Sequence, residues 1–292
     1  MKRLFFWRQA GAGVSGQPSA PAAEAPPQAL RLTDLSLAYQ GREVVSGVSG
    51  CFAPGRLTAI IGPNGAGKSS LLAAIMGRLS PSAGRIDLPP ALRAHLAWLP
   101  QQAQIERSVP MRVADVVALG LWRELGPFGG LRADQQQRVQ AALDAVGLGA
   151  QAERPVAALS AGQFQRMLFA RVLVQDTQLV LLDEPFNAVD EDTAADLMVI
   201  VRRWRDEGRT VIAVLHDLQL VRTAFDEVLW LNRRCLAWGP TAEVLQVRPA
   251  VPEPALADLA GELPDGCWSG ALPEVLPPGW RGRPADRPVL AT

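Results

Sequence analysis

The chain has 292 residues, of which 48% are hydrophobic, so it can bury the core of one large domain or of two small ones. Its 29 basic and 29 acidic residues give a formal net charge of +0, which argues against a nucleic-acid-binding protein, because such proteins usually carry a basic excess. The three widely spaced cysteines argue against a disulfide framework, and the sequence has no uninterrupted apolar run of about 18 residues that would predict a membrane span.

Residues 1–29 are predicted to be a disordered leader and linker. The opening Met1-Lys2-Arg3 and the apolar Leu4–Trp7 are similar to the start of a signal peptide, but this apolar run is shorter than the roughly 7 to 15 residues that such a peptide needs. A short anchor at a membrane surface is the alternative, because aromatic and basic residues favour that interface. Residues 10–29 are rich in Ala, Pro, Gly and Ser, which indicates a flexible linker.

Residues 30–246 are predicted to form an α/β domain, because strand and helix patterns alternate along them. Apolar patterns indicate strands over 30–39, 44–45, 48–52, 57–61, 96–99, 179–182 and 210–215. The last two are continuous apolar runs, which are typical of central strands in a parallel sheet covered on both faces. Helical spacing marks 70–76, 113–120, 134–146 and 163–174. The second and third of these helices predict a helical insertion over about 103–160. Residues 247–292 are Pro-rich and are predicted to be an irregular tail with one short helix near 255–263.

The most informative segment reads Gly-Pro-Asn-Gly-Ala-Gly-Lys-Ser and fits the phosphate-binding loop of nucleoside triphosphatases, G-x-x-x-x-G-K-[ST]. Glycines let successive backbone N–H groups converge on a phosphate, and the N-terminus of the following helix completes the anion site. A chance glycine-rich turn is the alternative, but a strand is predicted before the loop and a helix after it. The residues predicted to bind the nucleotide here are Gly62, Pro63, Asn64, Gly65, Ala66, Gly67, Lys68, Ser69 and Ser70.

Side chains at and beyond this loop predict the hydrolysis of a nucleoside triphosphate. Lys68 is expected to reach the β- and γ-phosphates, and the Ser69 hydroxyl is expected to hold Mg²⁺. Asp183 and Glu184 end the apolar run 179–182, and polar residues at the carboxyl end of a parallel strand face the ligand crevice. Asp183 is predicted to hold Mg²⁺, directly or through water, and Glu184 to act as the general base toward the attacking water. A strand followed by a polar turn is the alternative, which the phosphate-binding loop upstream disfavours.

The segment Leu159-Ser160-Ala161-Gly162-Gln163 resembles the LSGGQ signature of ATP-binding-cassette (ABC) ATPases. It lies 20 residues before the Asp183-Glu184 pair, where that family places it. The resemblance covers about residues 30–245, with the family's motifs in order. It implies a RecA-like core with a phosphate-binding loop, an antiparallel β subdomain and an inserted helical subdomain. It also implies that the cofactors are ATP and Mg²⁺.

The same resemblance implies roles for single residues. Tyr39 matches the aromatic residue that stacks on adenine, Gln101 matches the Q-loop glutamine, and His216 matches the switch histidine that touches the γ-phosphate. Asp190 matches the acid of the D-loop, in Asn187-Ala188-Val189-Asp190. Plainer interpretations are a core or surface tyrosine, a surface glutamine and an ordinary polar histidine at a strand end. The implied catalytic residues are Lys68, Gln101, Glu184 and His216, the implied Mg²⁺ residues are Ser69, Gln101 and Asp183, and the implied signature contacts to ATP are Ser160, Ala161, Gly162 and Gln163.

Ala161 departs from the family pattern, because it replaces the first glycine of LSGGQ. In this family the signature of one subunit caps the γ-phosphate bound by the other subunit. The added methyl group is tolerated where φ is negative and costs energy where φ is positive. It therefore affects how tightly the two subunits enclose the ATP between them. The catalytic groups that match the family motifs are all present, so we expect hydrolysis.

A single cassette in the chain implies a head-to-tail homodimer with two composite sites, by the same resemblance. The predicted lack of a membrane span implies a separate integral membrane permease, for which the family uses the helical insertion as its docking surface. The split arrangement resembles bacterial importers more than exporters. The chain is therefore expected on the cytoplasmic side of the plasma (inner) membrane, with a separate extracytoplasmic metal-binding protein and without a nucleic-acid partner.

Four segments resemble the zinc and manganese branch of these importers. They are Gly41–Val45, Phe164–Arg171, Leu182–Phe186 and Ala213–Leu218. The predicted function is therefore the ATPase of an importer for zinc or manganese. A siderophore or haem importer is the alternative, because its cassettes are similar. A soluble ABC ATPase that acts on nucleic acid or ribosomes is a further alternative, which the single cassette and the lack of a basic excess disfavour.

Overall fold

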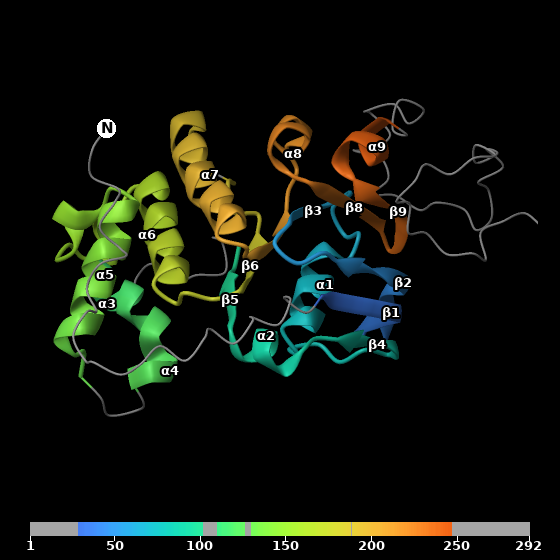
Figure 1. The fold of residues 1–292 in the computed structure, drawn as a ribbon, viewed down its shortest axis with the longest axis horizontal. Helices are drawn as coiled ribbons and strands as arrows, with labels where there is room; N and C mark the ends of the chain where they lie inside the picture. Colours follow the sequence, from blue (N-terminus) through green and yellow to red (C-terminus); the bar gives the residue numbers. More distant parts are fainter. Residues whose placement is uncertain (1–28, 102–109, 126–129, 188, 247–292) are drawn as a thin grey trace, which may run out of the picture.

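The computed structural model describes residues 29–101, 110–125, 130–187 and 189–246, and Figure 1 shows their fold. In these ranges the strands form one sheet of three and one sheet of six. The predicted leader, the Pro-rich tail and its short helix near 255–263 lie outside the described residues, except for residue 29.

The smaller sheet is antiparallel, has the order β2-β1-β4, and consists of β1 (Leu30–Tyr39), β2 (Arg42–Phe52) and β4 (Ala83–Asp87). The strands predicted over 44–45 and 48–52 are parts of one continuous strand, β2. Its pairing with β1 contains three register shifts, and irregular pairing hides the alternation of buried and exposed residues. Strand β4 is largely exposed, so its sequence carries no apolar pattern that could have predicted it.

The larger sheet has the order β5-β6-β7-β3-β8-β9 and is parallel, except that β9 runs antiparallel to β8. The predicted strands 57–61, 96–99, 179–182 and 210–215 are confirmed, and the last two lie side by side inside the sheet, whereas β8 and β9 were not predicted. The strands are β3 (Leu57–Ile61), β5 (Leu96–Leu99), β6 (Leu179–Asp183), β7 (Thr210–Val214), β8 (Glu227–Asn232) and β9 (Arg234–Pro240).

Helices surround this sheet and continue into a helical region beside it (Figure 1). The α-helices are α1 (Lys68–Ile75), α2 (Pro90–Ala94), α3 (Val113–Ala118), α4 (Trp122–Leu125), α5 (Ala133–Ala145), α6 (Ala161–Leu173), α7 (Glu191–Asp206), α8 (Leu218–Ala224) and α9 (Thr241–Gln246). Short 3₁₀ turns are η2 (Leu119–Leu121), η3 (Gly149–Gln151) and η4 (Val156–Ala158). Helices α3, α4 and α5 fall within the predicted helical insertion. None of the helices in the described ranges has the length and apolar character needed to cross a membrane.

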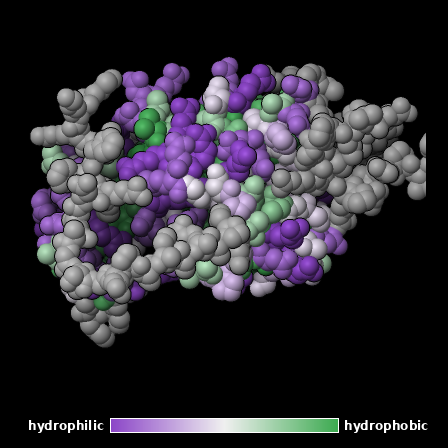
Figure 2. Space-filling view, viewed as in Figure 1, coloured by the Kyte–Doolittle hydropathy of each residue, from purple (hydrophilic) through white to green (hydrophobic). Residues whose placement is uncertain are grey.

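Each face of the larger sheet has its own apolar core, and strand β6 contributes to both. Val180 and Leu182 belong to the core shared with α6 and α7, whereas Leu179 and Leu181 belong to the core shared with α1 and the smaller sheet. This alternation explains why β6 reads as an uninterrupted apolar run, since a strand buried on both faces needs apolar residues at every position. Figure 2 shows hydrophilic side chains over much of the outer side of α7, with a hydrophobic spot among them.

Candidate functional site

Four neighbouring strands end at the same edge of the larger sheet, and each leads into a residue that was predicted to belong to the site. Strand β3 leads to Gly62, β5 leads through Pro100 to Gln101, β6 ends at Asp183 before Glu184, and β7 leads through Leu215 to His216. Ligands of open α/β sheets bind outside the carboxyl ends of the strands. The topology therefore gathers residues that are more than 150 positions apart in the sequence.

The glycines of the phosphate-binding loop occupy conformations and spaces that other residues would not. Gly62, Gly65 and Gly67 have φ values of +149°, +78° and +91°. A Cβ atom at Gly62 would collide with the carbonyl oxygen of Leu231, and one at Gly67 would lie 2.5 Å from the carbonyl oxygen of Val44. Gly67 is also the N-cap of α1, which has no side-chain cap and no acidic residue in its first turn. The first N–H groups of α1 are thus arranged to bind an anion.

The turn between β8 and β9 braces this loop from outside. Arg233, at φ +55°, donates its N–H to the carbonyl of Ala66 at 3.0 Å. The carbonyl of Arg233 accepts a hydrogen bond from the N–H of Ser46, in β2, at 2.6 Å. One residue therefore joins the loop to the turn and to the smaller sheet.

The side chain of Lys68 is buried against the loop. Its Nζ donates hydrogen bonds to the carbonyl oxygens of Gly62 and Pro63, both at 2.8 Å. Burial lowers the pKa of Lys68, and the negative charges of Glu184 and Asp183 oppose that shift. The ammonium group thus lies inside the curve of the loop, where a phosphate group would face it.

Ser69 and Asp183 form an oxygen pair beside Lys68. The Ser69 hydroxyl donates to Oδ1 of Asp183 at 3.3 Å, and the Asp183 side chain is almost fully buried. Burial raises the pKa of Asp183, and the hydrogen bond from Ser69 opposes that shift. A hydroxyl oxygen and a buried carboxylate fit Mg²⁺, which prefers oxygen ligands and would offset the cost of burying the negative charge.

The carboxylate of Glu184 is the centre of the site, because two other segments and a residue of its own turn contact it. Nε2 of Gln101 donates to Oε2 at 2.7 Å, Nδ2 of Asn187 donates to the same oxygen, and Nε2 of His216 lies 2.8 Å from Oε1. Glu184 also has φ +51°, immediately before Pro185. A non-glycine residue in this left-handed region is strained, and such strain is concentrated at functional sites.

The signature segment begins helix α6. Ser160 is the N-cap, its Oγ accepts a hydrogen bond from the N–H of Gln163 at 3.2 Å, and Oε1 of Gln163 accepts one from the N–H of Ser160. Ala161 is the first residue of the helix, and its φ is not positive, so its methyl group is accommodated without backbone strain. A Cβ atom at Gly162 would lie 3.3 Å from Oγ1 of Thr193, so α6 passes close to α7 here.

The predicted site residues thus form one connected cluster and three separate features. Lys68, Ser69, Gln101, Asp183, Glu184 and His216 are joined by hydrogen bonds or electrostatic contacts. Within the described ranges none of the six is hydrogen-bonded to Tyr39, to the signature segment or to Asp190. Tyr39 ends β1 with an exposed fraction of 58%, which leaves its ring open for stacking. Asp190 is the N-cap of α7, where its Oδ1 accepts the N–H of Thr193 at 2.8 Å.

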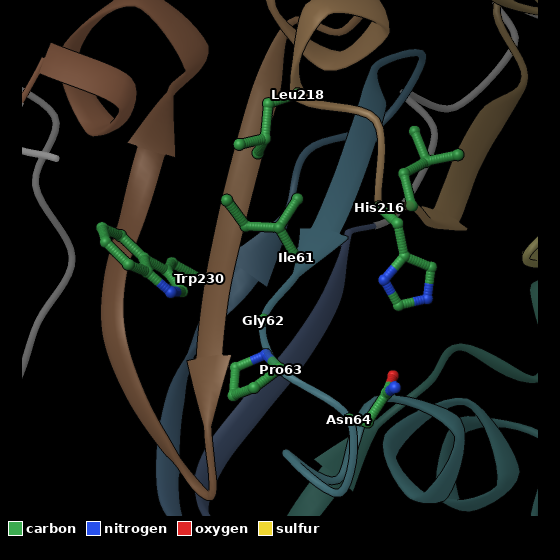
Figure 3. Close-up of a pocket in the computed structure, with 8 residues that line it drawn as sticks. Ile61, Gly62, Pro63, Asn64, His216, Leu218 and Trp230 are labelled. Atoms are coloured by element: carbon green, nitrogen blue, oxygen red, sulfur yellow. The ribbon is translucent and has the colours of Figure 1, made fainter. Parts of the chain in front are cut away.

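A hollow of about 210 Å³ lies next to the phosphate-binding loop, on the side of His216. Figure 3 shows the residues that line it. Its apolar wall includes Trp230 from β8 and Leu218 from α8, and sequence reasoning missed both. Trp230 could not have been found from a motif, because β8 was not predicted and only the sheet order brings it beside β3, whereas Leu218 lies two residues after His216 in a segment already singled out. The role of Asn187 at Glu184 was also missed, although a polar residue three positions after the acid, in the same turn, was a usable signal. The lining residues are Ile61, Gly62, Pro63, Asn64, Leu215, His216, Leu218 and Trp230.

Comparison with known proteins gives matches over most of the domain. Residues 45–187 match the family model described as ABC transporter. The zinc transport system ATP-binding protein TroB of Treponema pallidum is 40% identical over 215 residues, which are 72% of this chain and 81% of that protein. The manganese transport system ATP-binding protein MntB of Listeria innocua is 34% identical over 218 residues, which are 73% of this chain and 91% of that protein.

The solved structures agree with these relatives. An inward-facing conformation of a putative metal-chelate type ABC transporter matches with a TM-score of 0.67 and 26% sequence identity, over 74% of this chain and 85% of that one. The chain therefore combines the fold, the phosphate-binding loop and the signature helix with sequence matches to the ABC transporter family. The chain belongs to the ABC transporter family, as an ATP-binding and ATP-hydrolysing subunit that acts with a membrane permease.

Proposed function

We propose that two copies of this chain form a head-to-tail dimer that hydrolyses Mg²⁺-ATP and thereby drives the uptake of zinc or manganese through a separate membrane permease. A separate extracytoplasmic protein delivers the metal, and the cassettes bind the permease from the cytoplasmic side of the plasma membrane. The convergence of Gln101, Asn187 and His216 on the Glu184 carboxylate carries the hydrolytic part of the proposal. The names of TroB and MntB support the choice of metal.

Each part of the nucleotide is bound by a different kind of group. The N–H groups of the loop and the ammonium of Lys68 bind the phosphates, and the exposed ring of Tyr39 stacks on the adenine. Ser69 and Asp183 hold Mg²⁺, which supplies positive charge to the phosphates when it is bound. Ser160, Ala161, Gly162 and Gln163 of the partner copy cover the γ-phosphate, next to Asp190.

Glu184 is the general base. Its carboxylate accepts a proton from the attacking water. The hydrogen bonds from Gln101 and Asn187 fix the orientation of this carboxylate and thereby help to position the water. His216 holds the other carboxylate oxygen, in the tautomer that carries the proton on Nε2. Three segments that follow different strands must therefore be in place together before the base is correctly oriented.

The test is transport by the whole system. The experiment reconstitutes the chain with its permease in proteoliposomes, with ATP on the side of the membrane where the cassette lies and the metal-binding protein on the opposite side. The uptake of radioactive zinc, manganese and an iron chelate is then compared. Uptake of free zinc or manganese that Glu184→Gln abolishes supports the proposal. Uptake of the chelate alone would move the function to a siderophore or haem importer, for which the metal-chelate description of the structural relative is a specific reason.

A further inference from the structure

A buried glutamine connects helix α6 to the turn that carries the general base. Gln165 lies in the second turn of α6 and is only 1% exposed, although glutamine side chains are mostly exposed in proteins. Its Nε2 donates a hydrogen bond to the carbonyl oxygen of Pro185 at 2.6 Å, and Pro185 directly follows Glu184. The bond therefore joins α6 to the peptide group next to the base.

The other end of the same amide shows why this bond matters. Oε1 of Gln165 is buried and has no hydrogen-bond partner within the described ranges. A carbonyl oxygen can only accept, so the NH₂ group must face Pro185, and the amide cannot be turned to satisfy Oε1. An unsatisfied buried acceptor costs free energy that an apolar side chain would avoid. The benefit of a polar side chain at this position therefore lies in its bond to Pro185.

The carbonyl of Pro185 belongs to a strained turn. Glu184 has φ +51°, a conformation that its surroundings must hold in place. The N–H of Glu184 donates to the carbonyl of Val214 at 3.2 Å, and its carbonyl accepts the N–H of Asn187 at 3.3 Å. Gln165 fixes the peptide group that follows Pro185. The backbone on both sides of the base is thus held by hydrogen bonds, which sets the direction of its side chain.

Aromatic packing strengthens the same connection. Phe169 lies four residues after Gln165, so the two side chains share one face of α6. The ring centroid of Phe169 lies 6.2 Å from that of Phe186 and 6.0 Å from that of Trp204 in α7, which lies next to α6 in Figure 1. One face of α6 therefore contacts both residues that follow Glu184.

The first turn of α6 belongs to a different site from the second turn. In the proposed dimer, residues 160–163 cover the ATP that the partner copy binds, whereas Gln165 contacts the turn of the base in its own chain. Arg166 fixes the helix between these contacts, since its Nη2 lies 2.9 Å from Oδ2 of Asp196 in α7. A single helix thus serves the signature of one site and the base of the other.

We infer that Gln165 is a positioning residue for hydrolysis, which holds the turn of Glu184 through the carbonyl of Pro185 and so aligns the base in its own chain. It contacts the turn and not the carboxylate, and it acts through Glu184. The inference rests on the proposed role of Glu184 as the general base and adds a residue of α6 to those that orient it. A merely structural glutamine would instead affect ATP binding as much as turnover.

The first test compares two glutamines that each donate to a backbone carbonyl. Gln165→Met removes the donor but keeps the length of the side chain. We expect the kcat of ATP hydrolysis by the full chain to fall about tenfold with the KM for ATP within twofold, because the phosphate-binding loop is untouched. Gln175→Met is the matched control, since Nε2 of Gln175 donates to the carbonyl of Arg171 at 2.9 Å, at the far end of α6, and its kcat should stay within twofold.

Three results of this comparison would overturn the inference. They are an unchanged kcat in Gln165→Met, a loss of ATP affinity as large as the loss of kcat, and equal losses of kcat in Gln165→Met and Gln175→Met. Gln165→Asn decides the matter if Gln165→Met is not recovered in folded form. It keeps the amide but is one methylene shorter, so its N–H does not reach Pro185, and its kcat should fall to a similar extent. Wild-type kcat in Gln165→Asn would contradict the need for this bond.

Mixed dimers test in which site Gln165 acts. Two copies with different affinity tags are co-expressed, and one copy carries Glu184→Gln, so that only the base of the other copy hydrolyses ATP. We expect the tenfold loss only when Gln165→Met lies in the copy that retains Glu184. A loss only when it lies in the Glu184→Gln copy would show that it acts through the signature segment. Equal losses in both arrangements would show a general effect on α6, and either result would overturn the inference.

This inference and the proposed function fail separately. If Glu184→Gln abolishes turnover but Gln165→Met does not lower kcat, the positioning inference alone is wrong. If Gln165→Met lowers kcat but neither zinc nor manganese is transported, the role of Gln165 stands and the metal assignment falls.

Discussion

The imidazole Nε2 of His216 lies 2.8 Å from Oε1 of Glu184, although the two residues follow different strands of the sheet. The contact exists because β6 and β7 are neighbours whose carboxyl ends are aligned, with Asp183 opposite Val214. The geometry of the base is thus a property of the sheet and not of either loop alone.

Replacing this base should separate ATP binding from turnover. Glu184→Gln keeps the shape of the side chain but replaces one acceptor oxygen with an NH₂ group and cannot accept the proton, so phosphate release should fall by about 10²- to 10⁴-fold. ATP affinity should remain, and the ATP-bound dimer should accumulate in light scattering. Glu153→Gln, at an exposed ion pair with Arg112, is the control and should turn over normally. A variant that stays monomeric at saturating ATP would contradict the composite site.

Asn187 is expected to position the base. Asn187→Ala removes a donor to Oε2 of Glu184, so kcat should fall about tenfold with little change in the KM for ATP. Asn187→Asp places a like charge against the carboxylate and should be worse than alanine. Steady-state kinetics of the three proteins checks the order, and an equal loss in both variants would indicate that only the packing of the turn matters.

The buried carboxylate of Asp183 should lower the free energy of unfolding at neutral pH. Burial raises its pKa in the folded protein above the unfolded value, so the folded state binds the proton more tightly, and stability falls as pH rises from the unfolded to the folded pKa. Above that window Asp183→Asn removes the penalty and should raise the free energy of unfolding by about 1 kcal/mol, or roughly 2–4 °C in Tm. Thermal unfolding at neutral pH and at a pH below both pKa values measures the difference, which should vanish in acid. A variant less stable than the wild type at neutral pH would contradict the assignment of burial as the cause.

The signature alanine should be functionally neutral. Ala161→Gly restores the family residue at the first position of α6, where φ is not positive, so turnover should change by less than threefold. Ser160→Ala, by contrast, removes the cap of α6 and should cost about 1 kcal/mol as well as activity. A large gain of activity in Ala161→Gly would show that the methyl group weakens the contact between subunits.

A packing prediction concerns Gly50 in β2. A Cβ atom there would collide with the indole ring of the buried Trp238, so Gly50→Ala should destabilise the domain by about 1–3 kcal/mol. Gly130→Ala is the matched control, because no atom of the residues that the structure describes lies within 4 Å of a Cβ atom there. Chemical denaturation of both variants measures the difference. Equal stabilities would mean that Trp238 moves aside without cost.

The sequence predicted the parts of the fold in which chemistry or burial is local. The loop 62–69 and the run 179–182 could be recognised because a phosphate site needs glycines and a doubly covered strand needs apolar residues throughout. Strand β4 could not be predicted, since it is held by pairing with β1 while its side chains face solvent. The left-handed conformation of Glu184 was equally hidden, because the contacts around its side chain come from two segments distant in the sequence, those of Gln101 and His216.

The turn at Arg233 has a consequence for how the ATP site could be impaired from a distance. Its N–H binds Ala66 and its carbonyl binds Ser46, so the wall that supports the phosphates is built partly by a segment more than 160 residues downstream. Damage to the β8–β9 hairpin would therefore weaken ATP binding although no residue of that turn belongs to the phosphate-binding motif. A truncation that removes β8 and β9 is expected to lose the nucleotide site together with the sheet edge, even with residues 62–69 intact.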